Sequence, residues 1–244
     1  RYDALVPDTL DLAERCRVAA HGMVWSVSDT RYDHEPYSMV CYDHRPAYAT
    51  FGNGIGLTSS PKYAEVLPML RIASGSEESL DVESEFMRCY LARVSPGDGL
   101  HYSTRITPFS RKDRPWHNDA YPIPPGGKRI KDQDMMDVYL NSRHVMALMA
   151  WYERSGDKAW LPLIRKAVTG LESAAIVKGD YAYYPDGGIG MPFSRPRSGW
   201  VKTDEAKGEA EGGEGSMFMY HGGQIRAFAR YYELTGDKNA LEMA

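Results

Sequence analysis

Apolar residues recur at helical spacing over much of the chain and divide the predicted helices into two types. Residues 134–155 carry apolar side chains on more than one face, which is typical of a helix buried on several sides. Residues 158–174 carry a single apolar stripe, which is typical of a helix with an exposed outer face. The hydrophobic pattern predicts helices over residues 4–22, 61–74, 77–94, 134–155, 158–174 and 216–234.

Three short segments repeat one pattern at a spacing of about 80 residues. Their glycines are Gly75, Gly156 and Gly236, each preceded by Ser or Thr and followed by Ser or Asp. Glycine readily adopts the left-handed conformation that ends a helix, and Ser or Asp caps the helix that follows. Such a tight joint makes its two helices antiparallel. The repeat therefore predicts three helical hairpins, joined at LRIASGSEESL, WYERSGDKAWL and YYELTGDKNAL.

Three long segments, residues 23–60, 95–133 and 176–214, separate the hairpins and hold eleven of the 15 prolines. Within them, DGLHYSTRI and DYAYYPDGG have the pattern of small β-hairpins. Because short joints and long segments alternate along the chain, they are expected at opposite ends of the helices. Long loops inside a compact domain are commonly functional, so we expect function at the end with the long segments.

This alternation resembles the six-hairpin, (α/α)6-toroid glycosidase superfamily, including its β-L-arabinofuranosidase-like branch. The resemblance implies an all-α toroid whose inner helices follow the long segments, with the active site at their N-terminal ends. Most members are glycoside hydrolases, and relatives include polysaccharide lyases and sugar epimerases. The cysteine-rich zinc site of the arabinofuranosidase-like branch is not visible in a chain with only Cys16, Cys41 and Cys89, so its mechanism is not expected here.

The length of the chain is about half of what a closed ring requires. Six hairpins of about 80 residues would need roughly 480 residues, and the sequence has 244. We therefore expect residues 1–244 to form a single α/α-toroid domain with an incomplete ring, as the N-terminal part of a longer protein.

Glycoside hydrolysis needs two carboxyl groups, one to protonate the leaving oxygen and one to activate water or attack directly. Alignment of the repeats on their glycines places Asn53, Asp134 and Glu214 at equivalent positions, which for the last two is the start of an inner helix. Asp134 there is either a helix cap or a catalytic group. Glu214 ends a glycine-rich acidic stretch that is either a solvated loop or a lid, and Asp186 occupies a turn sequence. The candidate catalytic carboxyls are Asp119, Asp186, Glu211 and Glu214.

Sugar rings bind to aromatic faces, and polar side chains bind their hydroxyl groups. The aromatic residues of the long segments are therefore either packing residues or a sugar platform. Arg195 and Arg197 are either solvated or paired with a carboxylate or sulfate of the substrate. His221, one turn into the third inner helix, faces either a pocket or the core. The candidate substrate-binding residues are Trp116, His117, Tyr184, Arg195, Arg197, Trp200 and His221.

Composition and motifs narrow the classes of partner. The net charge of -4 gives no electrostatic reason to expect nucleic acid or an anionic membrane surface. No apolar run approaches the ~18–20 residues that span a bilayer. RYDHEPYSMVCYDHRPAY has metal-ligand residue types without a recognised metal-loop spacing, and neither a P-loop nor a dinucleotide fingerprint occurs. We expect a carbohydrate substrate and no metal or cofactor, whereas compartment and oligomeric state stay open.

Three functions fit these patterns. The first is a glycoside hydrolase acting on a plant or microbial polysaccharide or oligosaccharide. The second is a polysaccharide lyase, in which Tyr and His would abstract a proton beside a uronate. The third is a non-catalytic helical-repeat binding module, which the long aromatic and acidic segments disfavour because binding solenoids generally have short connections.

Overall fold

Helices dominate the structure, a computed structural model that describes residues 11–28, 30, 34–37, 39–50, 60–104, 134–185, 194–200, 203 and 218–244. The helices are α1 (Leu12–Trp25), α2 (Ser60–Ser74), α3 (Leu80–Leu91), α4 (Val138–Ser155), α5 (Trp160–Ala174), α6 (Phe218–Thr235) and α7 (Lys238–Met243). The strands are β1 (Met39–Cys41), β2 (Tyr48–Thr50), β3 (Ser103–Thr104), β4 (Asp134–Asp137), β5 (Ile176–Lys178), β6 (Tyr181–Tyr183) and β7 (Ser194–Pro196). This content is consistent with the predicted all-α class.

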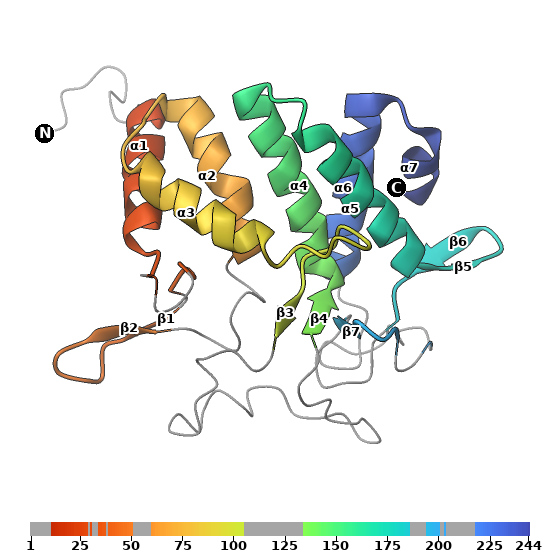
Figure 1. Cartoon of the computed structure of the whole chain (residues 1–244), viewed down its shortest axis with the longest axis horizontal. Coiled ribbons are helices and arrows are strands. Elements are labelled where there is room, and N and C mark those ends of the chain that lie inside the picture. Colours follow the sequence, from red (N-terminus) through yellow and green to blue (C-terminus); the bar gives the residue numbers. More distant parts are fainter. Residues whose placement is uncertain are drawn as a thin grey trace, which may run out of the picture.

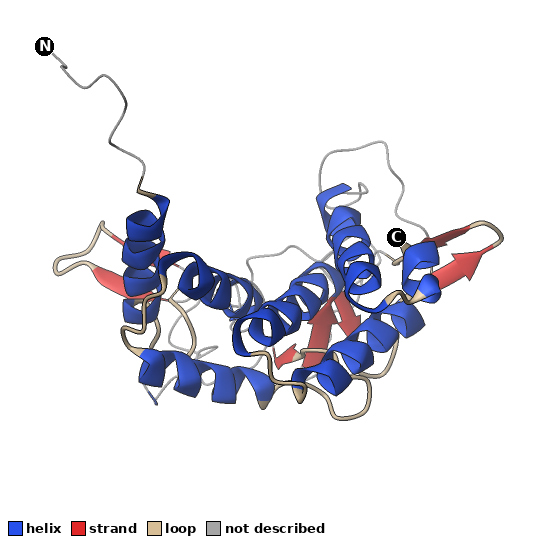
Figure 2. Cartoon of the chain, turned by 90° about the horizontal axis from the view of Figure 1, so that it is seen from above, coloured by secondary structure: helices blue, strands red, loops and turns tan. Residues whose placement is uncertain are grey.

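The helices form an open, curved double layer. Figure 2 shows α2, α4 and α6 on the concave side of the arc and α3 and α5 on its convex side. Helix α4 is central, since it packs against α2, α5 and α6. The joints α2–α3, α4–α5 and α6–α7 lie at one end of the helices, whereas β3, β4 and β7 lie at the other (Figure 1). We call these the joint end and the strand end.

Two apolar clusters hold the layers together. One lies between α4, α5 and α6, and the other between α1, α2, α3 and α4. Helix α4 contributes to both, which confirms that it is buried on several sides, and α5 buries one stripe, as its sequence pattern predicts. None of the described helices combines the length and apolar character needed to cross a membrane.

The three glycine-centred joints have the predicted backbone geometry. Gly75, Gly156 and Gly236 have positive φ angles of 66°, 67° and 73°. The amide of each donates to the carbonyl four residues earlier, at N···O distances of 2.8, 2.7 and 2.7 Å. A left-handed residue with this bond closes the C-terminus of a helix, so the repeat seen in the sequence is a structural repeat.

The residue before each glycine adds a second closure that the sequence analysis did not assign. The hydroxyls of Ser74, Ser155 and Thr235 each donate to the carbonyl four residues earlier, at 2.7 Å. Each also accepts from the amide two residues later, at 3.2 Å. Asp237 is the N-cap of α7 and accepts from the amides of Asn239 and Ala240, as predicted. Asp157 accepts from the amide of Ala159, but the N-caps of α5 and α3 are Ala159 and Ser79, so the prediction that Asp157 and Ser76 cap these helices is wrong.

The start of the second inner helix differs from the prediction. Residues 134–137 form strand β4, and α4 begins only after Asp137, whose carboxylate accepts from the amide of Leu140 at 2.9 Å. The expectation that Asp134 stands at a helix start is therefore wrong, because its backbone pairs with Thr104 in the β3–β4 ladder. Asn53 and Glu214 lie outside the described residues.

The strand predictions are confirmed in part. DYAYYPDGG contributes β6, which pairs antiparallel with β5 through a turn that contains Gly179 at a φ of 58°. DGLHYSTRI contains β3, but β3 pairs with β4 rather than within its own segment. Strand β7 then pairs with the other edge of β4, so three distant parts of the chain share one small sheet beside the start of α4.

Glycine also permits a close approach between the 95–100 loop and α5. A Cβ added at Gly170 would lie 2.3 Å from the carbonyl oxygen of Asp98, and one at Gly99 would lie 2.8 Å from the backbone of Ala167. Because the opposing atoms are backbone, neither contact can be relieved by a side-chain rotation. The loop that carries His101 is thereby packed directly on α5.

Substitution of Gly170 tests this packing. Gly170→Ala is expected to lower the free energy of unfolding by about 1–3 kcal/mol, the usual cost of overpacking a tight contact. Gly222→Ala in α6 is the control, because an added Cβ there meets nothing within 4 Å. The better helix propensity of alanine should leave that variant unchanged or stabilise it by up to about 1 kcal/mol. Urea unfolding followed by circular dichroism measures both, and equal shifts would contradict the packing argument.

Candidate functional site

The start of α4 places a buried carboxyl at the strand end. Asp137 is the last residue of β4 and the N-cap of α4, and its side chain is 6% exposed. Burial raises the pKa of Asp137 to about 7, although hydrogen bonds from the Leu140 and Tyr139 amides and the charge of Lys62 lower it. The carboxyl is therefore partly protonated at neutral pH, as a general acid must be.

Asn141, one turn into α4, fixes the neighbouring loop. Its Oδ1 accepts from the amide of His101 at 2.7 Å, and its Nδ2 donates to the carbonyl of His101 at 3.0 Å and to that of Asp137 at 2.9 Å. This buried amide is paired on both sides. It therefore sets the position of the His101 backbone relative to α4.

The His101 ring lies against a buried tyrosine–histidine pair. It stacks on Tyr90 at a centroid distance of 4.6 Å and is 3% exposed. His144 Nε2 faces the carbonyl of Gly99 at 3.1 Å and so carries its proton, which leaves Nδ1 to accept from the Tyr90 hydroxyl at 2.8 Å. Burial lowers the pKa of His144 to about 4, so this ring is neutral at physiological pH. Burial, with the charges of His144 and Arg93, also lowers the pKa of His101 well below its usual value.

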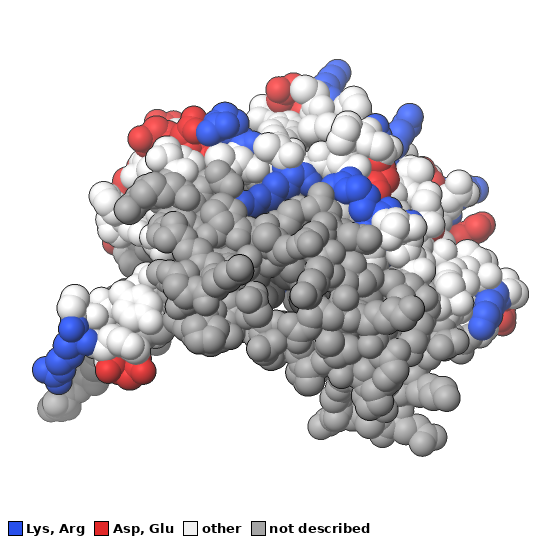
Figure 3. Space-filling model, turned by 60° about the horizontal axis from the view of Figure 1, so that its bottom comes forward, with Lys and Arg blue, Asp and Glu red and all other residues white. Residues whose placement is uncertain are grey.

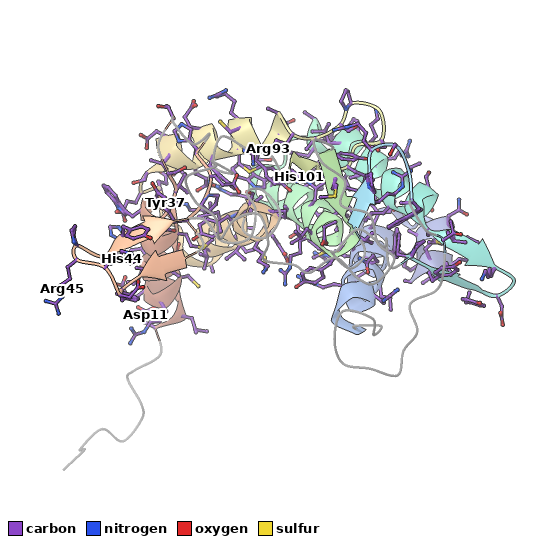
Figure 4. All side chains as sticks on the ribbon, turned by 90° about the horizontal axis from the view of Figure 1, so that it is seen from below. Asp11, Tyr37, His44, Arg45, Arg93 and His101 are labelled. Atoms are coloured by element: carbon purple, nitrogen blue, oxygen red, sulfur yellow. The ribbon has the colours of Figure 1, made fainter. Side chains whose placement is uncertain are left out.

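A second buried carboxylate lies close to this group. Glu35 is 4% exposed, and its Oε2 is 2.5 Å from Arg93 Nη1, while its other oxygen accepts from the Ser60 hydroxyl. Arg93 follows α3 and Ser60 begins α2, so the carboxylate links two helix ends. Figure 4 shows Arg93 and His101 near each other in the view from below.

Several buried polar atoms with unused hydrogen-bonding capacity belong to segments that adjoin the strand end. Among the residues that the structure describes, such atoms belong to His34, His101, Arg195 and Gln224. Gln224 is 3% exposed, and neither atom of its amide is paired. Buried polar groups are normally satisfied, so each of these unpaired atoms needs an explanation, and a role in a functional site is one.

The joint end shows the opposite pattern. Glu83 is 1% exposed, and its Oε2 lies 2.8 Å from Arg71 Nε while its Oε1 pairs with Arg154. Arg71 also donates to the carbonyls of Ser76 and Glu78, which fixes the first joint. Buried charges there are matched with partners and serve the fold.

Positive charge borders the strand end. Figure 3 brings this end forward and shows Lys and Arg side chains in a row across the described surface. Arg197, the residue after β7, has its guanidinium carbon 3.8 Å from the centroid of the Tyr102 ring. The Tyr102 hydroxyl donates to Asp98 at 2.7 Å, so this aromatic ring is held under the cation by its own hydrogen bond.

The described members of the predicted substrate-binding set fall into two groups. Tyr184 and Trp200 donate to the carbonyls of Leu171 and Ala174 at 3.1 and 2.8 Å, so both satisfy the C-terminal turn of α5. The ring of His221 lies 6.4 Å from that of Tyr184.

The second group lies on β7 and directly after it, in the strand that pairs with β4 beside Asp137. Arg195 is paired in register with Met136 of β4, and the next pair in that ladder is Asp137 with Ser194. Arg197 lies two residues further along, over Tyr102. The remaining predicted residues lie outside the described part of the chain: Asp119, Asp186, Glu211, Glu214, Trp116 and His117.

Sequence reasoning did not select Asp137, His101, Tyr90 or His144. The sequence does contain one indication of this site. Asn141 and His144 are polar residues at positions of α4 that the helical period predicts to be buried. Such positions are compatible with ordinary helix packing, so only the three-dimensional contacts separate them from solvated residues.

The metal-ligand residue types near the N-terminus are not arranged as a metal site where they are described. Glu35 is committed to Arg93 and Ser60, whereas His44 pairs with Asp43 at 2.8 Å on the exposed β1–β2 connection. Within the described residues, no group of three His, Cys, Asp or Glu side chains is placed to hold a metal ion.

Comparison of the chain with models of known protein families, with curated proteins and with solved structures found no match.

The pKa of Asp137 predicts a pH dependence of stability. The folded pKa is about 7, against a usual value of 3.8, so between these values the folded chain binds more protons than the unfolded chain. The stability associated with Asp137 is therefore greatest below about pH 4 and is lost as the pH rises to about 7. Urea unfolding of the wild type and of Asp137→Asn across this range should show the gap between them changing in that direction, whereas a constant gap would refute the raised pKa.

Proposed function

We propose that the chain is a carbohydrate-active enzyme, a glycoside hydrolase built on an (α/α) toroid and acting on a plant or microbial polysaccharide or oligosaccharide. The observation that carries the proposal is the gathering of a buried, partly protonated carboxyl and of unpaired polar atoms at the strand end. This is the end at which the inner helices α2 and α4 begin. Toroid glycosidases place their active sites at the corresponding end.

The chemistry of hydrolysis explains why a carboxyl like Asp137 is the central clue. The leaving oxygen must receive a proton, and a carboxyl with a pKa near 7 retains that proton at neutral pH. A second carboxyl must remain ionised, to activate water or to attack. Asp119, Asp186, Glu211 and Glu214 are the candidates for this role, and each belongs to a segment whose flanking described residues lie at the strand end.

The buried histidines His101 and His144 also support the proposal, because they indicate that little water reaches this part of the strand end. The Tyr90–His144 pair and the stacked His101 form a buried, uncharged group that Asn141 connects to the start of α4 through the His101 backbone. Asp137 at that helix start is itself buried, and a desolvated carboxyl has a stronger electrostatic effect on a reacting sugar. Asp137 and the second carboxyl are then the reacting groups, while the aromatic and imidazole rings position them.

A hydrolysis assay tests the proposal. The full chain is incubated with a panel of plant and microbial polysaccharides and chromogenic glycosides, and new reducing ends are measured. Hydrolysis is expected, and Asp137→Asn should lower kcat by at least about 100-fold, the effect of losing a general acid. Glu85→Gln is the control, because Glu85 is an exposed residue of outer helix α3 that pairs only with Arg88 in the described contacts.

Three outcomes would contradict this assignment. Turnover that survives simultaneous replacement of Asp119, Asp186, Glu211 and Glu214 would remove the second carboxyl from the mechanism. Release of an unsaturated product absorbing in the ultraviolet, without addition of water, would instead identify a lyase. Binding of glycans without turnover by the wild type would identify a binding module.

A further inference from the structure

One carboxylate joins the three inner helices. Glu65 of α2 is 3% exposed. Its Oε2 lies 2.8 Å from Nη1 of Arg143 in α4, and its Oε1 lies 2.8 Å from Nη2 of Arg226 in α6. These three helices belong to three different hairpins, so the Glu65 network connects all three repeats.

The Glu65 network lies on the concave side of the arc. Helix α4 buries apolar residues in both clusters, whereas Tyr139, Arg143 and Glu153 form a stripe of exposed or half-exposed positions on the same helix. Because α2 and α6 flank α4 in the concave layer (Figure 2), Glu65 of α2 can contact both Arg143 of α4 and Arg226 of α6.

The two arginines of the network differ in how many of their donors are used. Arg143 donates from Nε and Nη2 to the Tyr139 hydroxyl, at 3.1 and 2.9 Å, and from Nη1 to Glu65. Arg226 is bonded to Glu65 through Nη2, and its side chain is 52% exposed. Within the described contacts, Nε and Nη1 of Arg226 stay available to a ligand.

Charge balance changes along the inner layer. Near the Glu65 network, the cations Arg143 and Arg226 share one carboxylate, and Lys62 lies one turn before Glu65 on α2. One turn further along α6, Arg230 meets two carboxylates, Glu233 at 2.7 Å and Glu153. In the concave layer of α2, α4 and α6, the cations named here therefore outnumber the carboxylates near Glu65. Around Arg230, closer to the joint end, the carboxylates outnumber the cation.

We propose that Arg226 binds an acidic group of the glycan, either a uronate carboxylate or a sulfate ester, so that the substrate is an acidic glycan. This inference rests on the proposed function. A guanidinium recognises a planar or tetrahedral oxyanion through two parallel N–H donors, and Arg226 has donors to spare. Glu65 holds one corner of that guanidinium, which reduces the conformational entropy lost when a ligand binds.

Calorimetric titration of the full chain at low ionic strength tests the proposal with matched glycans. The probes are an oligogalacturonate and its methyl-esterified form, and a sulfated galactan oligosaccharide and its desulfated form. At least one acidic probe should bind about tenfold or more tightly than its neutral counterpart, as expected for a charge-assisted pair. The pair that shows the difference identifies carboxylate or sulfate as the group recognised.

Variants at two neighbouring arginines separate recognition from general charge. Arg226→Gln should abolish the preference for the acidic probe, and Arg226→Lys, which keeps a cation beside Glu65, should lose most of it. Arg230→Gln should leave the preference within about twofold of wild type, because the donors of Arg230 are already engaged. Thermal unfolding establishes that each variant is folded.

Equal binding of acidic and neutral probes by the wild type would overturn the inference, as would equal losses in Arg226→Gln and Arg230→Gln. The readout is binding, so it is independent of turnover. Selective binding without hydrolysis would leave this inference standing and remove the proposed function. Hydrolysis of neutral glycans without preferential binding of acidic ones would support the proposed function and overturn the inference about Arg226.

Discussion

The architecture depends on one constraint, the reversal of the chain within a few residues at Gly75, Gly156 and Gly236. A left-handed residue at each position ends the helix with its own amide bonded to the carbonyl four residues earlier, so that the chain can reverse at once. The preceding Ser or Thr hydroxyl, bonded to both sides of the reversal, makes the joint nearly self-contained. All three joints therefore lie at one end, and every longer connection must return at the other.

Buried charge is distributed according to this division. At the joint end, Glu83 is matched by Arg71 and Arg154, an arrangement that fixes helix ends and leaves little for a ligand. At the strand end, His101, Arg195 and Gln224 keep buried polar atoms unpaired. An unpaired buried donor or acceptor lowers the stability of the fold by about 1–3 kcal/mol. A ligand that formed hydrogen bonds with these atoms would offset that loss.

The helices and joints could be predicted from the sequence because their signals are local. Glycine, the residue after it and the apolar period are each readable within about ten residues, and all three joints followed from them. The start of α4 could not be read in the same way, because the pairing of β4 with β3 and β7 comes from distant segments and overrides the helical pattern of residues 134–137. Asp134 and Asp137 are both acidic residues near a helix start, and only that pairing decides which of them caps α4.

The candidate site was harder still, because its groups are also parts of the fold. Asp137 ends a strand and caps a helix, Asn141 fixes a loop, and Glu65 ties together three hairpins. No motif marks them, since each has an adequate structural role.

Helix α4 is buried among α2, α5 and α6, and this burial makes Asp137 a candidate for chemistry as well as a structural residue. The start of α4 is buried, so the carboxyl of its N-cap, Asp137, is shielded from water. The backbone amides that donate to this carboxyl still favour its ionised form. The two effects oppose each other, and burial prevails at Asp137, where the pKa reaches about 7. Glu65 experiences the same burial but has two guanidinium partners, and it serves instead to hold Arg226 on the concave face. Asp137 is thus the candidate for chemistry, whereas Glu65 is engaged by two guanidinium groups and fixes the position of Arg226.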